Sequence, residues 1–310
     1  MKRQAGTKLW QWPALAFFVA TIALTSAVNA TENGGSVYPI GVETVLPGMT
    51  PPPGGTMFYE FTVYLTANQV NGQNGNAVPT EFKLRFLANA VEIKHNWGGK
   101  FLGGNLESLV AIPFEAEGLH VAPGKFSKFA VGNIGVSPLG VAYARGHRNF
   151  YYEGDLWFPG TGRSASDVLN VGQNNYAVVP VGAITYLAGK EELSSKFQYI
   201  VNLQDTATQY HSGQEFIWEF DGMHAVTRKV AIGLNGYFYK QATDDLLNNV
   251  IYNDGNRGRS LAIGPEIRFN VIREGAVAVK YLHDTLVQNR APTNAVWFQL
   301  GIPIHFGHKE

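Results

Sequence analysis

The chain has 310 residues, of which 45% are hydrophobic and 15% charged, and its 24 Lys and Arg balance its 24 Asp and Glu. The charged share lies well below the roughly 25% of ordinary soluble domains. The sequence contains no cysteine, which excludes a disulfide framework, a thiolate metal site and a cysteine nucleophile. The charge balance gives no indication of a nucleic-acid partner.

Residues 1–30 have the composition of a secretory signal peptide. Three basic residues stand near the start, residues 14–24 form an apolar run, and Val28 and Ala30 provide the small side chains that precede a cleavage site. The apolar run is too short to cross a bilayer as a mature helix. We therefore expect an exported protein that begins near Thr31 and carries 21 Lys and Arg against 24 Asp and Glu, a net charge of −3.

Residues 31–56 are dense in Gly and Pro, which argues against any long helix or strand there. From residue 57 on, apolar and polar side chains alternate in about twelve segments, as they do in β-strands with one apolar face. In the stretch 82–94, Val91 and Ile93 fall one residue out of step with Phe82, and this change predicts a β-bulge near residues 88–90. The expected strands cover residues 57–68, 82–94, 102–115, 139–145, 149–158, 176–187, 197–207, 215–221, 229–241, 260–271, 275–286 and 295–306.

The strand lengths and connections favour a membrane barrel. Several segments exceed ten residues, whereas globular strands average about five or six and membrane barrel strands need about nine to eleven. Short connections, such as the turn at 146–147, alternate with longer loops rich in Asn, Gly and Asp, such as 242–259. Short turns at one end and long loops at the other are typical of outer-membrane barrels. We predict an all-β fold: an antiparallel transmembrane barrel over residues 57–310.

The stretch 260–271 illustrates the choice between a soluble sandwich and a barrel. Leu261 and its alternate neighbours form an apolar row, and Glu266 and Arg268 lie mid-strand on the opposite face. An Arg turned toward lipid costs about 2–4 kcal/mol, whereas a hydrated barrel interior accommodates it. We therefore place the apolar row against lipid and the charged row inside. Pro265 donates nothing to the ladder, so we expect a local gap in pairing there, and a lateral exit at that gap is a hypothesis.

Nearly the whole mature chain, from Glu32 to Phe306, also resembles a known family. The most specific stretches are 32–56, 236–245 and 255–267, with "ATQYHSGQEF" and "ITYL" adding to them. They resemble the outer-membrane proteins of the phenol meta-degradation type, which are transporters associated with aromatic-compound breakdown. The resemblance implies a monomeric β-barrel in the outer membrane of a Gram-negative bacterium and the passage of hydrophobic aromatic molecules. One departure is the tail "GHKE" after Phe306, since such chains often end on an aromatic residue.

The interior of the barrel is the predicted functional site. Aromatic faces beside charged groups would hold a small aromatic solute in weak successive sites, or would simply fill space around a structural charge network. The Gly/Pro-rich segment is apolar enough to fold into the lumen as a plug near the periplasmic end, with a flexible periplasmic tail as the alternative. The plug candidates are Val37, Tyr38, Ile40, Val42 and Leu46. The lumen-facing candidates for the solute path are Glu60, Tyr64, Trp157, Tyr237, Tyr239, Glu266, Arg268, Lys280 and Trp297.

Evidence for catalysis is weak. The sequence has no G-x-S-x-G or H-E-x-x-H motif. His211 and Ser212 are adjacent, and on a strand they would point to opposite faces. The loop 243–256 gathers oxygen ligands without the ordered spacing of a calcium loop. We predict a passive outer-membrane channel for small hydrophobic or aromatic compounds, without enzymatic activity, cofactor or metal, whose partners are membrane lipid and solute. An outer-membrane hydrolase and an adhesive or structural barrel acting through its loops are the alternatives.

Overall fold

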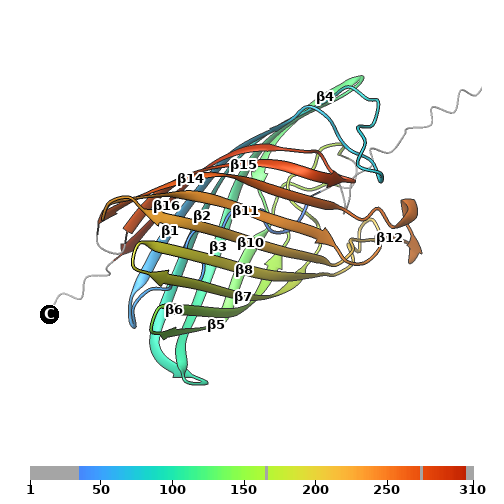
Figure 1. Ribbon diagram of the computed structural model, residues 1–310. Coiled ribbons are helices and arrows are strands. Elements are labelled where there is room, and N and C mark those ends of the chain that lie inside the picture. The colour runs from blue at the N-terminus through green and yellow to red at the C-terminus, as the bar shows by residue number, and fades with distance from the viewer. Residues whose placement is uncertain (1–34, 165–166, 273–274, 305–310) are drawn as a thin grey trace, which may run out of the picture.

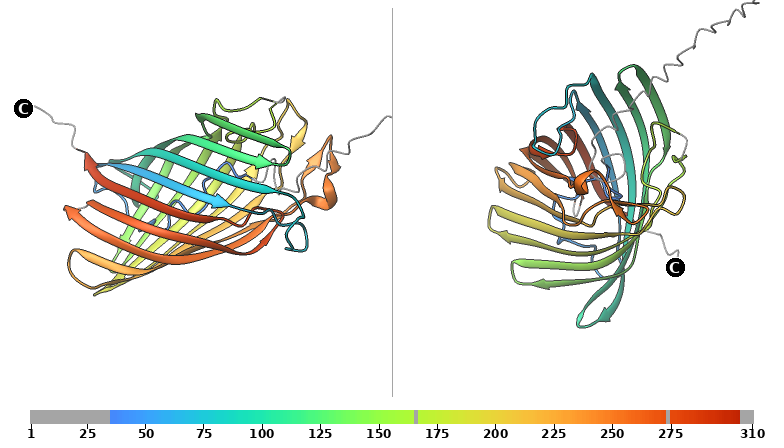
Figure 2. Two further views of the ribbon diagram at one scale, coloured as in Figure 1. Left: turned by 90° about the horizontal axis from the view of Figure 1, so that it is seen from above. Right: turned by 90° about the vertical axis from the view of Figure 1, so that its right-hand side faces the viewer.

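In the computed structural model, which describes residues 35–164, 167–272 and 275–304, twelve antiparallel strands close into a barrel (Figures 1 and 2). The barrel closes because β2 pairs with both β1 and β3. The predicted fold class is therefore confirmed. The barrel strands are β1 (Thr56–Ala67), β2 (Phe82–Phe101), β3 (Gly104–Val121), β5 (Ile134–Arg145), β6 (Arg148–Phe158), β7 (Ala177–Ala188), β8 (Glu191–Asn202), β10 (Glu215–Ala225), β11 (Val230–Gln241), β14 (Arg259–Ile272), β15 (Gly275–Gln288) and β16 (Asn294–Ile304).

One strand of the large sheet lies outside the closed ring. β4 (Gly124–Val131) pairs with the distal half of β3 and forms a hairpin that projects from one end of the barrel (Figure 1). At the same end, β9 (Tyr210–His211), β12 (Leu246–Leu247) and β13 (Val250–Ile251) form a small separate sheet, followed by the short 3₁₀ turn η2 (Asn253–Gly255). In the described residues, no helix has the length and apolar character needed to cross a membrane.

The two ends of the barrel differ as predicted. Turns as short as 146–147 and 189–190 close one end, and the connections 68–81, 159–176, 203–214 and 242–258 lie at the other. Because outer-membrane barrels have short periplasmic turns and long extracellular loops, the end with the short turns is periplasmic. β1 begins and β16 ends there, paired from Thr56 to Ile304. The proposed signal peptide and Phe306 lie outside the described residues.

The outer face is apolar over most of the wall. Large hydrophobic side chains point outward and stay exposed, whereas their alternate neighbours are buried inside. In β14, Ile263 is 46% exposed while Glu266 is 3% exposed and Arg268 7%. The predicted orientation of this strand is therefore correct, and the apolar outer face fits an outer-membrane location. Exposed members of the apolar surface include Leu156, Val178, Phe197, Trp218, Leu234, Ile263, Phe269, Val296 and Phe298.

The predicted β-bulge near residues 88–90 is wrong. β2 pairs with β1 and β3 without interruption through this region, and its irregularity lies between Asn96 and Lys100. The apolar residues move from the inner to the outer face of β2 because the interior of the barrel beside this strand changes from apolar to polar. The strand itself stays regular. Phe82 packs inside against the extracellular loop residue Val70, whereas farther down Glu92 turns inward and Ile93 faces outward.

The wall remains closed at Pro265. Pairing to β15 lapses at Gly264 and Pro265, as expected for a residue without an amide hydrogen, while pairing to β11 continues through both. The register of β14 with β15 is the same on either side of the lapse. A Cβ on Gly264 would lie 1.9 Å from the Tyr281 carbonyl oxygen, so the two strands touch at this point. The predicted gap in pairing is confirmed on the β15 side, and the contact between the two strands argues against a lateral exit there.

Candidate solute path through the lumen

The Gly/Pro-rich segment runs through the interior of the barrel (blue in Figure 2). Val37, Tyr38 and Val42 are buried in one apolar cluster with Phe61 and Val63 of β1. Ile40 packs against the same cluster, and Leu46 lies farther down, toward the periplasmic end. The segment supplies apolar side chains to an interior whose wall is largely polar. Because its contacts run from Val37 to Leu46, it fills the lumen over much of its height and not only at its periplasmic end.

Lys280 of β15 attaches this segment to the wall. Its buried ammonium group donates hydrogen bonds to the carbonyl oxygens of Gly41 and Val42, at 3.0 and 2.8 Å, and to the Thr44 hydroxyl at 3.0 Å. The same nitrogen lies 5.4 Å from the centre of the Trp297 ring. Three acceptors and an aromatic face replace part of the hydration that the buried charge loses.

Glu219 of β10 provides a second attachment. Its carboxylate accepts hydrogen bonds from the Tyr38 hydroxyl at 2.7 Å and from the Gly41 amide at 2.5 Å. Gly41 has φ of 91°, a conformation that favours glycine, and an added Cβ would lie 2.8 Å from Leu282. The Tyr38 ring meets the Trp157 ring edge to face, with centres 5.9 Å apart.

An ion pair between Lys196 of β8 and Glu43 forms the third attachment. Burial alone would raise the pKa of Glu43, but the nearby ammonium groups of Lys196 and Lys94 outweigh burial and lower this pKa to about 2. Lys94 also lies 4.4 Å from the centre of the Tyr151 ring. The segment is thus held by charged groups from several different strands, and each contact would have to break for it to leave.

Seven of the nine predicted lumen residues do lie on the inner face. Trp157, Tyr237, Tyr239, Glu266, Arg268, Lys280 and Trp297 are all buried there. Tyr237 donates a hydrogen bond to Asp284, and the Arg290 guanidinium stacks 4.3 Å from the centre of the Tyr239 ring. These two aromatic residues lie in the extracellular half, whereas Glu266 and Arg268 lie toward the periplasmic end.

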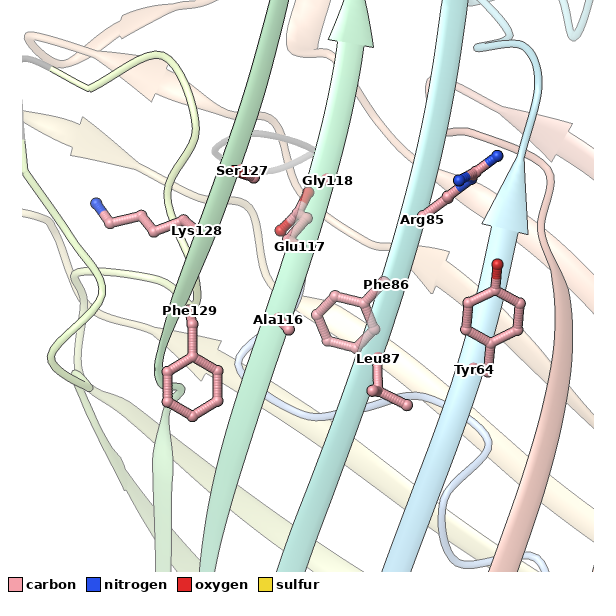
Figure 3. A pocket seen from close by; sticks show the side chains of 10 residues that line it. All are labelled: Tyr64, Arg85, Phe86, Leu87, Ala116, Glu117, Gly118, Ser127, Lys128 and Phe129. Carbon is pink, nitrogen blue, oxygen red and sulfur yellow. The ribbon is translucent and has the colours of Figure 1, made fainter.

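The remaining two predictions, Glu60 and Tyr64, are wrong in orientation. Both lie on the outer face of β1, and Glu60 accepts hydrogen bonds there from Thr62 and Asn89. Figure 3 shows Tyr64 beside Leu87 of the neighbouring strand β2, and these two side chains are 48% and 49% exposed. The alternation in β1 is inverted because the lumen at this strand contains the apolar segment. Its apolar face therefore turns inward.

Two charged residues of the lumen were not selected from the sequence. Glu192 and Lys196 sit at alternate, inward-facing positions of β8. Their period of two was available as a signal, but their partners on the N-terminal segment and on distant strands were not. In the described part of the chain, no three His, Asp or Glu side chains are grouped so as to hold a metal ion.

The extracellular mouth is organised around Asp245. Its carboxylate accepts hydrogen bonds from Tyr210, Gly213, Gln241 and Asn256, at 2.5, 2.7, 2.7 and 2.9 Å. Burial raises the pKa of Asp245, and the four donors oppose that rise. This one carboxylate joins the small sheet of β9 and β12 to the top of β11. The loop 242–258, which contains Asp245, is therefore an ordered cover over the extracellular mouth of the barrel.

One solved structure shares this fold, and two others match it more weakly. The COG4313 outer membrane channel from Pseudomonas putida F1 matches with a TM-score of 0.70 and 15% identity, over 82% of this chain and 96% of that chain. The translocator domain of autotransporter NalP from Neisseria meningitidis gives a TM-score of 0.48 with 10% identity, over 84% and 92% of the two chains. The CymD monoaromatic hydrocarbon channel gives 0.41 with 8% identity, over 92% and 100%. A search of curated protein sequences finds no match.

The sequence itself assigns the family. A family profile matches residues 67–300, which is most of the barrel. This range includes the stretches 236–245 and 255–267, whose resemblance to phenol meta-degradation proteins is noted above. The chain is an outer-membrane β-barrel that belongs to the family described as "Putative MetA-pathway of phenol degradation".

Proposed function

We propose that this barrel lets small hydrophobic or aromatic molecules cross the outer membrane by passive diffusion. The observation that carries the proposal is a closed barrel of the phenol-degradation family whose lumen holds an apolar segment within a charged wall. The solved COG4313 protein of the same fold is an outer membrane channel. Apolar side chains of the segment offer an aromatic solute contacts that a water-filled pore lacks.

The N-terminal segment is the gate in this proposal. It fills the lumen and is fixed by three separate polar attachments, at Lys280, Glu219 and Lys196. A large hydrophilic solute finds no continuous wide path past it. A small aromatic molecule passes between the segment and the wall, where aromatic rings such as Trp157 and Tyr38 meet edge to face.

The barrel acts as a monomer and without catalysis in this proposal. His211, which stands beside Ser212, uses its Nε2 atom in a hydrogen bond of 2.9 Å with the Asn202 backbone oxygen. That contact ties the imidazole to the rim of the barrel. A serine-reactive probe is expected to leave the protein unlabelled, and sedimentation in detergent is expected to give the mass of one chain.

Uptake into liposomes tests the proposal. Purified barrel is reconstituted, and entry of phenol, toluene and glucose is compared with entry into protein-free vesicles and into vesicles that hold an unrelated eight-stranded barrel. We expect acceleration of the two aromatic solutes and little effect on glucose. Equal acceleration of glucose would identify a general porin, and no acceleration of any solute would refute the channel.

A further inference from the structure

A shallow groove of about 420 Å³ lies on the outer surface of the barrel wall. The Tyr64 and Leu87 side chains border it on one side and the Phe129 ring borders it on the other (Figure 3). Leu87 and Phe129 both pair with Ala116 of β3, so they stand on the same face two strand spacings apart, about 9.5 Å. The middle strand, β3, therefore forms the floor of the groove.

The floor is low because β3 carries Ala116 and Gly118 at successive outward positions. A Cβ added to Gly118 would meet nothing closer than the Arg85 carbonyl oxygen, at 3.9 Å. The Phe129 side chain is 71% exposed and projects from the wall as one raised edge. A hydrocarbon chain that lies along the floor contacts apolar side chains on both edges.

The upper edge of the groove coincides with the extracellular rim of the ring. Thr66 stands next to the last residue of β1, and it pairs with Arg85 on one side and with Asn294, the first residue of β16, on the other. Tyr64 lies one outward position lower and directs its hydroxyl toward this rim (Figure 3). Aromatic residues with that orientation mark the level of the lipid head groups in outer-membrane barrels.

Basic side chains gather directly above the apolar edges. Arg85 and then Lys83 are the next outward residues of β2, and Lys83 pairs with His120, which pairs with Lys125 of β4. The three cations are exposed, and none of them forms an ion pair with a carboxylate in the described part of the chain. The Glu81 carboxylate, nearby, lies 3.6 Å from the His120 ring. The rim above the groove therefore lacks counter-charges for its lysine and arginine side chains.

Glu117 and Lys128 also border the groove, but they belong to the inward row of the two strands. They pair with each other across β3 and β4, beside Phe86, whose ring packs against the apolar cluster inside the barrel. The Lys128 ammonium group forms an ion pair of 2.6 Å with Asp167 of the loop 159–176. These charges therefore compensate one another on the other face, and the outer row keeps its positive excess.

We propose that this groove binds the phosphorylated glycolipid of the outer leaflet, the lipid A part of lipopolysaccharide. One acyl chain lies between Leu87 and Phe129, and a phosphate group accepts hydrogen bonds from the Arg85 guanidinium. Lys83 and Lys125 add positive charge above it. An arginine offers phosphate paired donors, and a lysine offers it a compact charge. The end of the barrel with the long loops is extracellular, so the leaflet around this rim is the outer one.

This binding is independent of solute passage, because the groove lies on the outside of the wall and the N-terminal segment lies inside it. Its consequence concerns the projecting hairpin. Among the described strands, β4 pairs only with β3, and it carries both Phe129 and Lys125. A lipid held by these two residues attaches the hairpin to the membrane surface.

Native mass spectrometry of the whole barrel, released from detergent micelles with a defined lipid, measures the binding. The probes are lipid A with both phosphates, the same lipid A after enzymatic removal of its phosphates, and phosphatidylglycerol. We expect the dephosphorylated lipid A and the phosphatidylglycerol to bind at least tenfold more weakly than the phosphorylated lipid A. Equal binding of the two forms of lipid A would overturn the role of the basic rim. Equal binding of phosphatidylglycerol would overturn the preference for the glycolipid.

A charge variant tests the rim. The double variant Lys83→Gln/Arg85→Gln is expected to bind phosphorylated lipid A roughly thirtyfold more weakly, since each basic residue near a lipid surface contributes to the attraction of anionic lipid. The matched control Lys190→Gln/Lys229→Gln removes the same charge from two exposed periplasmic turns and should bind normally. Equal weakening in both double variants would show that only net charge matters and would overturn the site.

A steric variant tests the groove itself. Gly118→Phe fills the floor, where a Cβ meets no close neighbour, and is expected to abolish the preference for phosphorylated lipid A. Gly154→Phe adds the same ring to an open outward position of β6 and should bind as the unaltered barrel does. Heat-modifiable gel mobility confirms that each variant is a folded barrel before it is compared. Normal binding of lipid A to a folded Gly118→Phe barrel would overturn the proposal.

Discussion

The Arg268 guanidinium on β14 donates two hydrogen bonds, of 2.7 and 2.5 Å, to the Glu192 carboxylate on β8. β10 and β11 separate these strands in the wall, so the pair reaches across the inside of the barrel. Both side chains are less than a tenth exposed. This ion pair narrows the periplasmic half of the lumen, and it is the bidentate arrangement that gives an arginine–carboxylate pair its strength.

Removal of one partner of this ion pair is expected to destabilise the barrel. Arg268→Leu leaves the Glu192 carboxylate buried and unpaired, which costs roughly 3 kcal/mol of unfolding free energy. The lumen also widens, so single-channel conductance rises. Urea unfolding in lipid vesicles measures the first effect. The double variant Arg268→Leu/Glu192→Leu should recover most of the stability, and additive losses would contradict a direct pairing.

Loss of the Lys280 ammonium group is expected to free the N-terminal segment. Lys280→Met keeps the aliphatic stem but loses the hydrogen bonds to Gly41, Val42 and Thr44. We expect severalfold higher ion conductance with frequent fluctuations in planar bilayers. Lys190→Met, in an exposed periplasmic turn, is the matched control and should behave as the unaltered barrel. A Lys280→Met channel as quiet as the control would show that the segment does not depend on this attachment.

The attachment through Glu43 predicts a pH dependence. The pKa of Glu43 is about 2 in the docked segment and about 4.3 in a free segment, so docking gains stability above about pH 4.3 and loses it as pH falls toward 2. Protonation of Glu43 itself should therefore raise conductance only in strong acid. Glu43→Gln should raise conductance already at pH 7. Equal conductance of the Glu43→Gln variant and the unaltered barrel at pH 7 would contradict this assignment.

The extracellular cover depends on Asp245. Asp245→Asn replaces one acceptor oxygen with a donor, so at least one of the hydrogen bonds from Tyr210, Gln241 and Asn256 is lost. We expect a loss of about 2 kcal/mol in local stability and faster protease cleavage within 242–258 on whole cells. Asp254→Asn changes an exposed neighbour in the same loop and should leave cleavage unchanged. Equal cleavage of the two variants would refute the role of Asp245.

The sequence predicted the barrel well because period-two alternation is a local property of each strand. β14 and β16 turned their predicted faces outward, and Arg268, Lys280 and Trp297 lie inside as expected. The alternation failed at β1 and at the upper half of β2. There an apolar partner, the N-terminal segment or the extracellular loop 68–81, lies inside the barrel. Periodicity separates two faces of a strand, but it does not say which face meets an apolar partner.

The sequence by itself determined the class of the protein: exported, all-β, with long strands, alternate short and long connections, and a Gly/Pro-rich segment ahead of them. The tertiary structure alone decided how the lumen is filled. Lys280 meets Gly41, and Glu219 meets Tyr38, across separations of 239 and 181 residues. Such contacts depend on the closure of the ring, which brings distant strands around one segment. Local alternation does not encode that closure, so the attachments of the segment became visible only in the folded barrel.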